Sequence, residues 1–140
     1  MRLRKMMLWA IVLLVATMSV HSLDNRVIDR FLDQAVADVE TTIYLAMLGG
    51  EDSSSRVDVE QAVQDFQELG FRTRLQLEDA VTAKHFAHIL MQTMEIPGGV
   101  MSRVFGSPRY AFRDMVAYGI LPQTLSANDE MSGEAVVALM

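Results

Sequence analysis

The sequence predicts an all-α protein, a compact bundle of three helix–loop–helix units that follows an N-terminal signal peptide. Three observations lead to this prediction. Apolar residues recur at helical spacing between glycine and proline breaks. The stretch 114–140 repeats the plan of 65–91 (helix, glycine stop, loop, helix) when Gly119 is laid on Gly70. The first 22 residues have the charge and hydropathy pattern of a leader.

The leader is predicted over residues 1–22. Three basic residues lie within the first five, residues 6–20 are almost wholly apolar, and Val20 and Ser22 place small residues before a cut at Leu23. The apolar run of 15 residues is shorter than the roughly 20 that a spanning helix needs. We therefore expect export to the periplasm or cell envelope, with 23–140 as one all-helical domain. The alternative is an uncleaved leader that anchors the chain in the inner membrane.

The composition excludes several classes of protein. The chain has no cysteine, so it has neither disulfides nor thiolate metal sites. The leader holds three of the 12 Lys and Arg residues and none of the 18 Asp and Glu residues, so the rest carries nine basic residues and a formal charge of −9. Nucleic-acid binding depends on neutralising phosphates with Lys and Arg. We therefore expect no nucleic-acid partner.

The first unit is predicted over about 23–50. Residues 23–34 have apolar side chains at helical spacing, with Asp24 or Asn25 as the N-cap. A second apolar helix follows over 39–48 and stops at Gly49 and Gly50. The break between the two helices is weak, so one continuous helix remains an alternative.

The second unit is predicted over about 58–96, after a polar linker at 51–56. Asp58 caps a helix over 59–69 that Gly70 ends. Thr82 caps the next helix, which carries Phe86 toward the core and is broken by the Pro97–Gly99 turn.

The third unit is predicted over about 107–140, after a short apolar segment at 100–105. Ser107 and Pro108 form a helix start, Gly119 stops that helix, and Ser132 caps the last one. In the alignment of the three units, Met131 and Val39 are both aligned with Val81. Each unit alone leaves an apolar face in water, so we expect the three to pack together.

The sequence pieces AVTAKHFAHILM and EMSGEAVVALM, each preceded by a helix ending in LGF or YGI, resemble S-layer-homology repeats. The resemblance implies a three-repeat bundle that holds an anionic cell-wall polymer. The segment 98–116 also resembles exported proteins of spirochaete-type envelopes. The family's arginine after the capping threonine is replaced by Ala83 and Gly133, and the only tryptophan is Trp9 in the leader. The resemblance therefore implies the fold, and the family's glycan site is transferred to no residue.

The best candidate for a binding surface is Arg103, Arg109 and Arg113 with Tyr110. Arg109 and Arg113 are four residues apart on one helix, so they share a face. The planar fork of arginine suits carboxylate or phosphate groups. The alternative is that these arginines form surface salt bridges of little energy, with Asp114, Glu95 or Glu134.

The sequence offers no metal, cofactor or catalytic site that we would assign. His85 and His88 are three residues apart on one predicted helix, but zinc needs three or four ligands. The acidic segment around Asp129, Glu130 and Glu134 lacks the residue order of a calcium loop. No nucleophile elbow, HExxH pair or phosphate loop occurs in the sequence.

These observations predict a non-catalytic exported envelope protein that acts as a structural or binding module. Its partner would be another envelope protein or an anionic cell-wall polymer, and the missing family residues favour a protein. The alternative from another class is a small periplasmic enzyme or ligand carrier, which an apolar pocket lined by Arg109, Tyr110 and His85 would favour. A membrane-anchored subunit with an uncleaved leader is the third interpretation. The oligomeric state stays open.

Overall fold

A computed structural model of the chain describes residues 22–49, 58–69 and 76–140. The chain divides into two units, 1–31 and 32–140, which are described separately. All regular structure in the described ranges is helical, apart from two isolated bridges between single residues. The predicted leader except Ser22, the linker 51–56, and the stops at Gly50 and Gly70 lie outside the described residues.

Helix α2 (Ser22–Leu32) belongs almost wholly to the first unit. Asp24 and Asn25 lie inside this helix, so their predicted role as N-cap is wrong. No Gly or Pro precedes Asp24 and Asn25 to force the helix to begin there. Asp and Asn favour the N-cap position but do not by themselves determine where a helix begins. Residues 33–38 separate α2 from the next helix, which excludes the continuous helix left open above.

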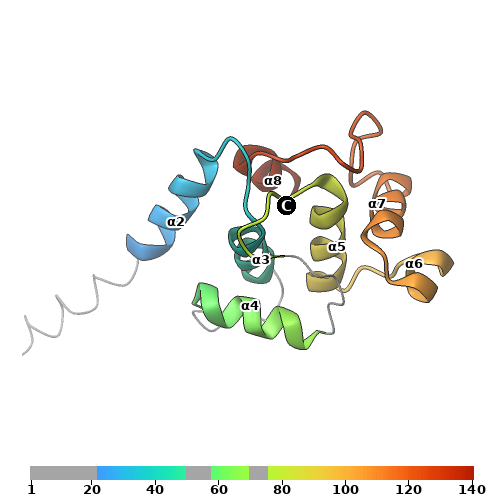
Figure 1. Cartoon of the computed structure of the whole chain (residues 1–140), viewed down its shortest axis with the longest axis horizontal. Coiled ribbons are helices and arrows are strands. Elements are labelled where there is room, and N and C mark those ends of the chain that lie inside the picture. The colour runs from blue at the N-terminus through green and yellow to red at the C-terminus, as the bar shows by residue number, and fades with distance from the viewer. Residues whose placement is uncertain (1–21, 50–57, 70–75) are drawn as a thin grey trace, which may run out of the picture. The chain divides into compact units, whose positions relative to one another are not determined.

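The described residues of the larger unit form six further helices: α3 (Val39–Leu48), α4 (Val59–Glu68), α5 (Ala83–Thr93), α6 (Val100–Phe105), α7 (Pro108–Ala117) and α8 (Gly133–Leu139). Helix α5 packs against both α3 and α7, α4 packs against α3, and α6 packs against α7 (Figure 1). The all-α prediction is confirmed at this level.

The predicted N-cap residues Asp58, Thr82, Ser107 and Ser132 occupy the N-cap positions of α4, α5, α7 and α8, and Asp38 is a further cap that was not predicted. The side chains of Asp38, Asp58 and Ser132 each accept a hydrogen bond from a backbone N–H in the first turn of α3, α4 and α8. Thr82 and Ser107 also occupy N-cap positions, but their side chains make no capping hydrogen bond. The Thr82 hydroxyl instead lies 3.0 Å from His85 Nδ1.

Three backbone hydrogen bonds form a closed ring at the centre of the larger unit. Ala37 N–H donates to Met131 O at 2.7 Å, Val81 N–H to Ala37 O at 2.8 Å, and Met131 N–H to Val81 O at 2.9 Å. These three residues are buried, and each stands two positions before the first residue of α3, α5 or α8. Segments far apart in the sequence thereby satisfy one another's buried peptide groups.

A second set of bonds surrounds the ring. The first residue of each of these three helices also donates a backbone hydrogen bond to another segment. Val39 N–H donates to Asp79 O at 3.2 Å, Ala83 N–H to Asp129 O at 2.9 Å, and Gly133 N–H to Gln34 O at 3.1 Å. The bonds therefore place Ala37, Val81 and Met131 in equivalent positions.

The ring tests the predicted repeat alignment. The ring agrees with the alignment of Met131 with Val81. The alignment of Val39 with Val81 is wrong by two residues, because Ala37 occupies the position in the ring that corresponds to Val81. Residues on several sides of α3 are buried, including Val39, Thr42, Ile43, Tyr44 and Ala46. Its apolar pattern therefore fits more than one register and does not fix the alignment.

The core of the larger unit draws on all of its helices except α6, which has no buried side chain. Phe66, Phe86 and Met115 are among its largest buried side chains. Tyr118, the C-cap residue of α7, does not belong to the core. Its side chain is 51 % exposed, and its hydroxyl donates to Pro97 O at 2.9 Å. Phe112 is buried on the same helix instead.

Replacing Phe86 tests the packing of α5. Its side chain is fully buried, so Phe86→Ala should lower the free energy of unfolding by about 3–5 kcal/mol. Phe105→Ala is the matched control, because Phe105 is 61 % exposed. Urea unfolding followed by circular dichroism measures both. A cost below roughly 1 kcal/mol for Phe86→Ala would contradict its place in the core.

Replacing Gly119 tests the stop after α7. Its φ of 74° lies in the left-handed region, where a side chain costs about 1–2 kcal/mol. Gly119→Ala should therefore destabilise the protein. Gly49→Ala is the control, because Gly49 caps α3 with a φ of −78° and a new Cβ would approach nothing closer than 3.6 Å. Thermal melting should fall only for Gly119→Ala, and equal melting of both variants would refute the assignment.

Candidate binding site

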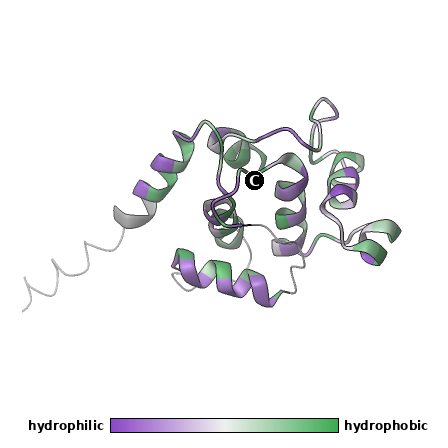
Figure 2. Cartoon of the chain, viewed as in Figure 1, coloured by the Kyte–Doolittle hydropathy of each residue, from purple (hydrophilic) through white to green (hydrophobic). Residues whose placement is uncertain are grey.

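Helix α6 is the least buried helix of the larger unit. Val100, Met101, Val104 and Phe105 are all exposed, with fractions from 48 % to 76 %. Their spacing places them on one side of the helix, and we call them the α6 apolar face. Figure 2 shows hydrophobic colouring over most of α6. The short apolar segment noted at 100–105 forms this helix, and its side chains face solvent rather than a core.

Polar contacts hold α6 against α7. The Asp114 carboxylate accepts hydrogen bonds from Gly99 N–H at 2.8 Å and from the Ser102 hydroxyl. At the other end, Gly106 closes the helix in the left-handed conformation, with a φ of 55°. Because these contacts fix its backbone, α6 keeps its place without burying its apolar side chains.

The predicted arginines are all exposed, Arg103 on α6 and Arg109 and Arg113 on α7. We call them the arginine patch. The alternative that they form salt bridges is not supported, since we find none with any described residue. Asp114, the nearest predicted partner in the sequence, instead accepts from Gly99 and Ser102.

The predicted Tyr110 is half-buried and lies against α6. Its ring stacks on the ring of Phe105, with centroids 5.5 Å apart and an interplanar angle of 29°. This pair joins α7 to the α6 apolar face and supplies aromatic surface beside the arginine patch.

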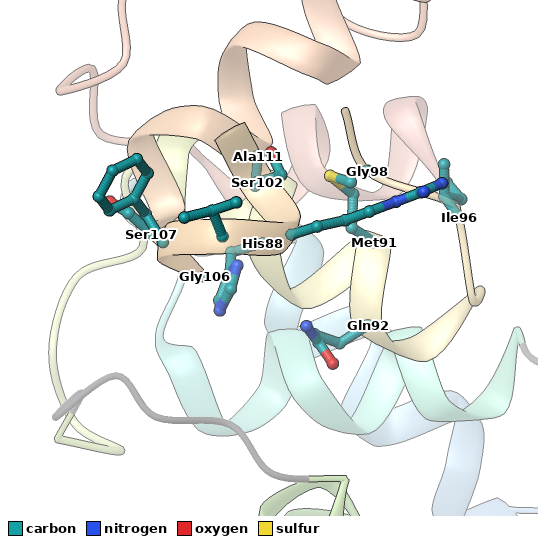
Figure 3. Close-up of a pocket in the computed structure, with 12 residues that line it drawn as sticks. His88, Met91, Gln92, Ile96, Gly98, Ser102, Gly106, Ser107 and Ala111 are labelled. Carbon is teal, nitrogen blue, oxygen red and sulfur yellow. The ribbon is translucent and has the colours of Figure 1, made fainter. Parts of the chain in front are cut away.

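A cavity of about 410 Å³ lies between α5, α6 and the start of α7 (Figure 3). Apolar side chains line part of the cavity: Met91, Ile96, Val104, Phe105 and Ala111. Polar or charged side chains and two glycines complete the lining: His88, Gln92, Ser102, Arg103, Ser107, Gly98 and Gly106. None of Arg109, Tyr110 and His85 lines this cavity, so it is not the pocket that would favour the enzyme or ligand-carrier alternative. Arg103 and His88 take part instead, because α6 folds back beside α5.

His88 is the buried titratable group of this cavity, with 5 % of its side chain exposed. Burial lowers the pKa of His88 to about 4, and the charge of His85 acts in the same direction. Burial also lowers the pKa of His85, assisted by Lys84 and partly opposed by Asp79. Both imidazoles are therefore neutral at neutral pH. The described residues contain no group of three or more metal-binding side chains.

The sequence singled out Arg103 but missed Gln92, Ser102 and Ser107 as lining residues. One signal was available: the Pro97–Gly99 break allows the chain to reverse and bring 100–107 back toward α5. His88 was noted only as half of a metal pair. Its role in the cavity depends on packing between helices, which spacing alone does not reveal.

Comparisons with known proteins give no relative: no family model matches the chain, and no curated protein or solved structure is significantly similar to it. No helix within the described ranges is long and apolar enough to cross a lipid bilayer. The function of the site must therefore follow from its own chemistry.

The burial of His88 predicts a loss of stability in acid. The unfolded chain binds a proton near the ordinary pKa of about 6.5, whereas folded His88 binds one only near pH 4. The stabilisation from neutral His88 is thus complete above pH 6.5 and falls as the pH drops toward 4, by roughly 1–3 kcal/mol. Urea midpoints at pH 7, 5.5 and 4.5 should show this fall.

His88→Gln is the control for that measurement. It removes the titrating group, so its midpoint should change less with pH than that of the wild type. His85 remains in both proteins, so its own lowered pKa cancels in the comparison. The same pH dependence in both proteins would show that His88 is not the cause.

Proposed function

We propose that this protein is a non-catalytic binding module of the cell envelope that docks another envelope protein through the α6 apolar face and the arginine patch. One observation carries the proposal: a complete helix presents four exposed apolar side chains, with exposed Arg103 on the same helix and exposed Arg109 and Arg113 on α7, which packs against it. Contiguous exposed apolar surface marks interaction sites.

The composition of this surface fits a protein partner. The centres of protein interfaces are enriched in aromatic residues, Met and Arg, and their strongest contacts come from aromatic and arginine side chains. Phe105 and Met101 supply the apolar part, and Arg103 supplies a cation with no ion pair to the described residues. A partner with an apolar ridge and a nearby carboxylate would complement both.

The three-unit, S-layer-homology-like interpretation of the fold remains part of this proposal. The equivalence of Ala37, Val81 and Met131 in the hydrogen-bond ring supports it. Ala83 and Gly133 stand where the family has its binding arginine. An acidic chain also repels an anionic polymer over most of its surface. Both points favour a protein partner over the wall polymer. The predicted leader at 1–22 supports export to the envelope.

The lining of the cavity supports binding rather than catalysis. The Ser102 hydroxyl donates to Asp114, and burial keeps His88 neutral with a pKa of about 4. A general base works best with a pKa near the operating pH. This chemistry therefore supports a non-catalytic role.

Site-specific photo-crosslinking tests the docking proposal. A photoreactive side chain at Met101, in cells that export the protein, should give a discrete adduct with one envelope protein. The same group at Glu60, exposed on α4, is the control and should not give that adduct. Adding Arg109→Glu and Arg113→Glu should weaken the Met101 adduct by reversing the charge beside it. Identical adducts from Met101 and Glu60, or none from Met101, would contradict the proposal.

Sedimentation with cell-wall sacculi tests the polymer as the partner. The purified chain without its leader should stay in the supernatant at low and high salt. Pelleting that disappears at high salt, and also in the Arg109→Ala, Arg113→Ala double variant, would assign the arginine patch to the wall polymer instead. Attraction between exposed charges is screened by salt, so this dependence identifies electrostatic binding.

A further inference from the structure

The cavity between α5, α6 and the start of α7 has one apolar and one polar portion. Met91, Ile96, Val104, Phe105 and Ala111 provide the apolar walls. Gln92 and Ser107 provide side-chain donors, and Figure 3 shows both of them around the same space. A ligand that fills such a space needs an apolar body and at least one polar group.

The charges of the lining favour an anion. Arg103 is the one permanently charged side chain among the described residues that line the cavity, and no carboxylate is among them. The whole chain, in contrast, has a formal charge of −6. Asp114 lies behind the lining and accepts hydrogen bonds from Gly99 N–H and the Ser102 hydroxyl. Its negative charge is thus partly satisfied within the wall.

The hydrogen-bonding groups favour an acceptor on the ligand. Arg103 and the Gln92 amide carry several N–H donors. The Ser107 hydroxyl occupies an N-cap position but makes no capping hydrogen bond, so it remains available to a ligand. An acidic oxygen accepts from all three types of donor, and charge assistance strengthens such bonds.

We propose that this cavity binds a small amphipathic anion, a molecule with an apolar ring or branched chain and one acidic group beside Arg103. Its volume of about 410 Å³ lies at the lower end of the 300–1,000 Å³ typical of ligand pockets. This role is additional to protein docking, with which it shares Arg103, Val104 and Phe105. It uses the cavity walls, and it holds whether or not the outward face of α6 binds a partner.

Binding would also provide apolar contacts that α6 lacks. Val104 is 68 % exposed and Phe105 61 % exposed, yet both line the cavity. A ligand body in the cavity covers part of both side chains, and burial of apolar area is favourable. The ligand therefore stabilises α6 in the position that Asp114 sets.

Two matched probes test the proposal. 8-Anilinonaphthalene-1-sulfonate is an amphipathic anion, and N-phenyl-1-naphthylamine is its neutral counterpart without the acidic group. Fluorescence titration of the full chain should show saturable binding of the sulfonate at one site. Arg103→Gln should weaken the sulfonate about tenfold or more and leave the neutral probe within roughly twofold, because it removes a charge-assisted hydrogen bond. Arg109→Gln is the control, and it should weaken the sulfonate by less than about twofold.

Two exposed valines of α6 provide a second pair of variants that should both fold. Val104 lines the cavity, whereas Val100, 76 % exposed, does not. Val104→Glu places a carboxylate at the site and should abolish sulfonate binding, while Val100→Glu should preserve it. Equal losses within either pair of variants would assign the probe to the general surface and overturn the proposal. Failure of the sulfonate to saturate would also overturn it. Neither result would affect the crosslinking test of protein docking.

Discussion

The rest of the fold depends on the ring of hydrogen bonds among Ala37, Val81 and Met131. A buried peptide group without a partner costs as much as a lost hydrogen bond. In this protein three segments that are 44 and 50 residues apart satisfy one another. The ring fixes where α3, α5 and α8 begin, so their apolar faces meet in one core. No single segment could satisfy its buried peptide groups in this way alone.

The position of the candidate site follows from this arrangement. Seven of the eleven residues of α5 are buried, since α5 packs against both α3 and α7. Two of the buried residues, His88 and Met91, also border the cavity together with Gln92. The Pro97–Gly99 break then reverses the chain, and Asp114 holds α6 beside that surface. Helix α6 itself has no buried side chain, so its apolar residues stay at the surface beside the cavity.

Local signals in the sequence were reliable where one residue determines the structure. Asp58 and Ser132 cap their helices with their side chains, and Gly119 takes the left-handed conformation. Register and exposure depend on packing, so they could not be read locally. The counterpart of Val81 proved to be Ala37, and Tyr118 proved to be exposed. The arginines were found because charge is visible in a sequence, whereas the cavity depends on how the three consecutive helices α5, α6 and α7 pack together.

The two proposed roles of α6 are physically coupled. Val104 and Phe105 belong both to the α6 apolar face and to the cavity lining. A ligand that restrains these side chains reduces the conformational entropy that a protein partner must still remove on docking. Linkage would make such an effect reciprocal: docking would raise the affinity for the ligand by the same factor. A short helix held by polar contacts suits this coupling, because its apolar side chains contribute nothing to the core that the ring organises and are free to contact a ligand or a partner.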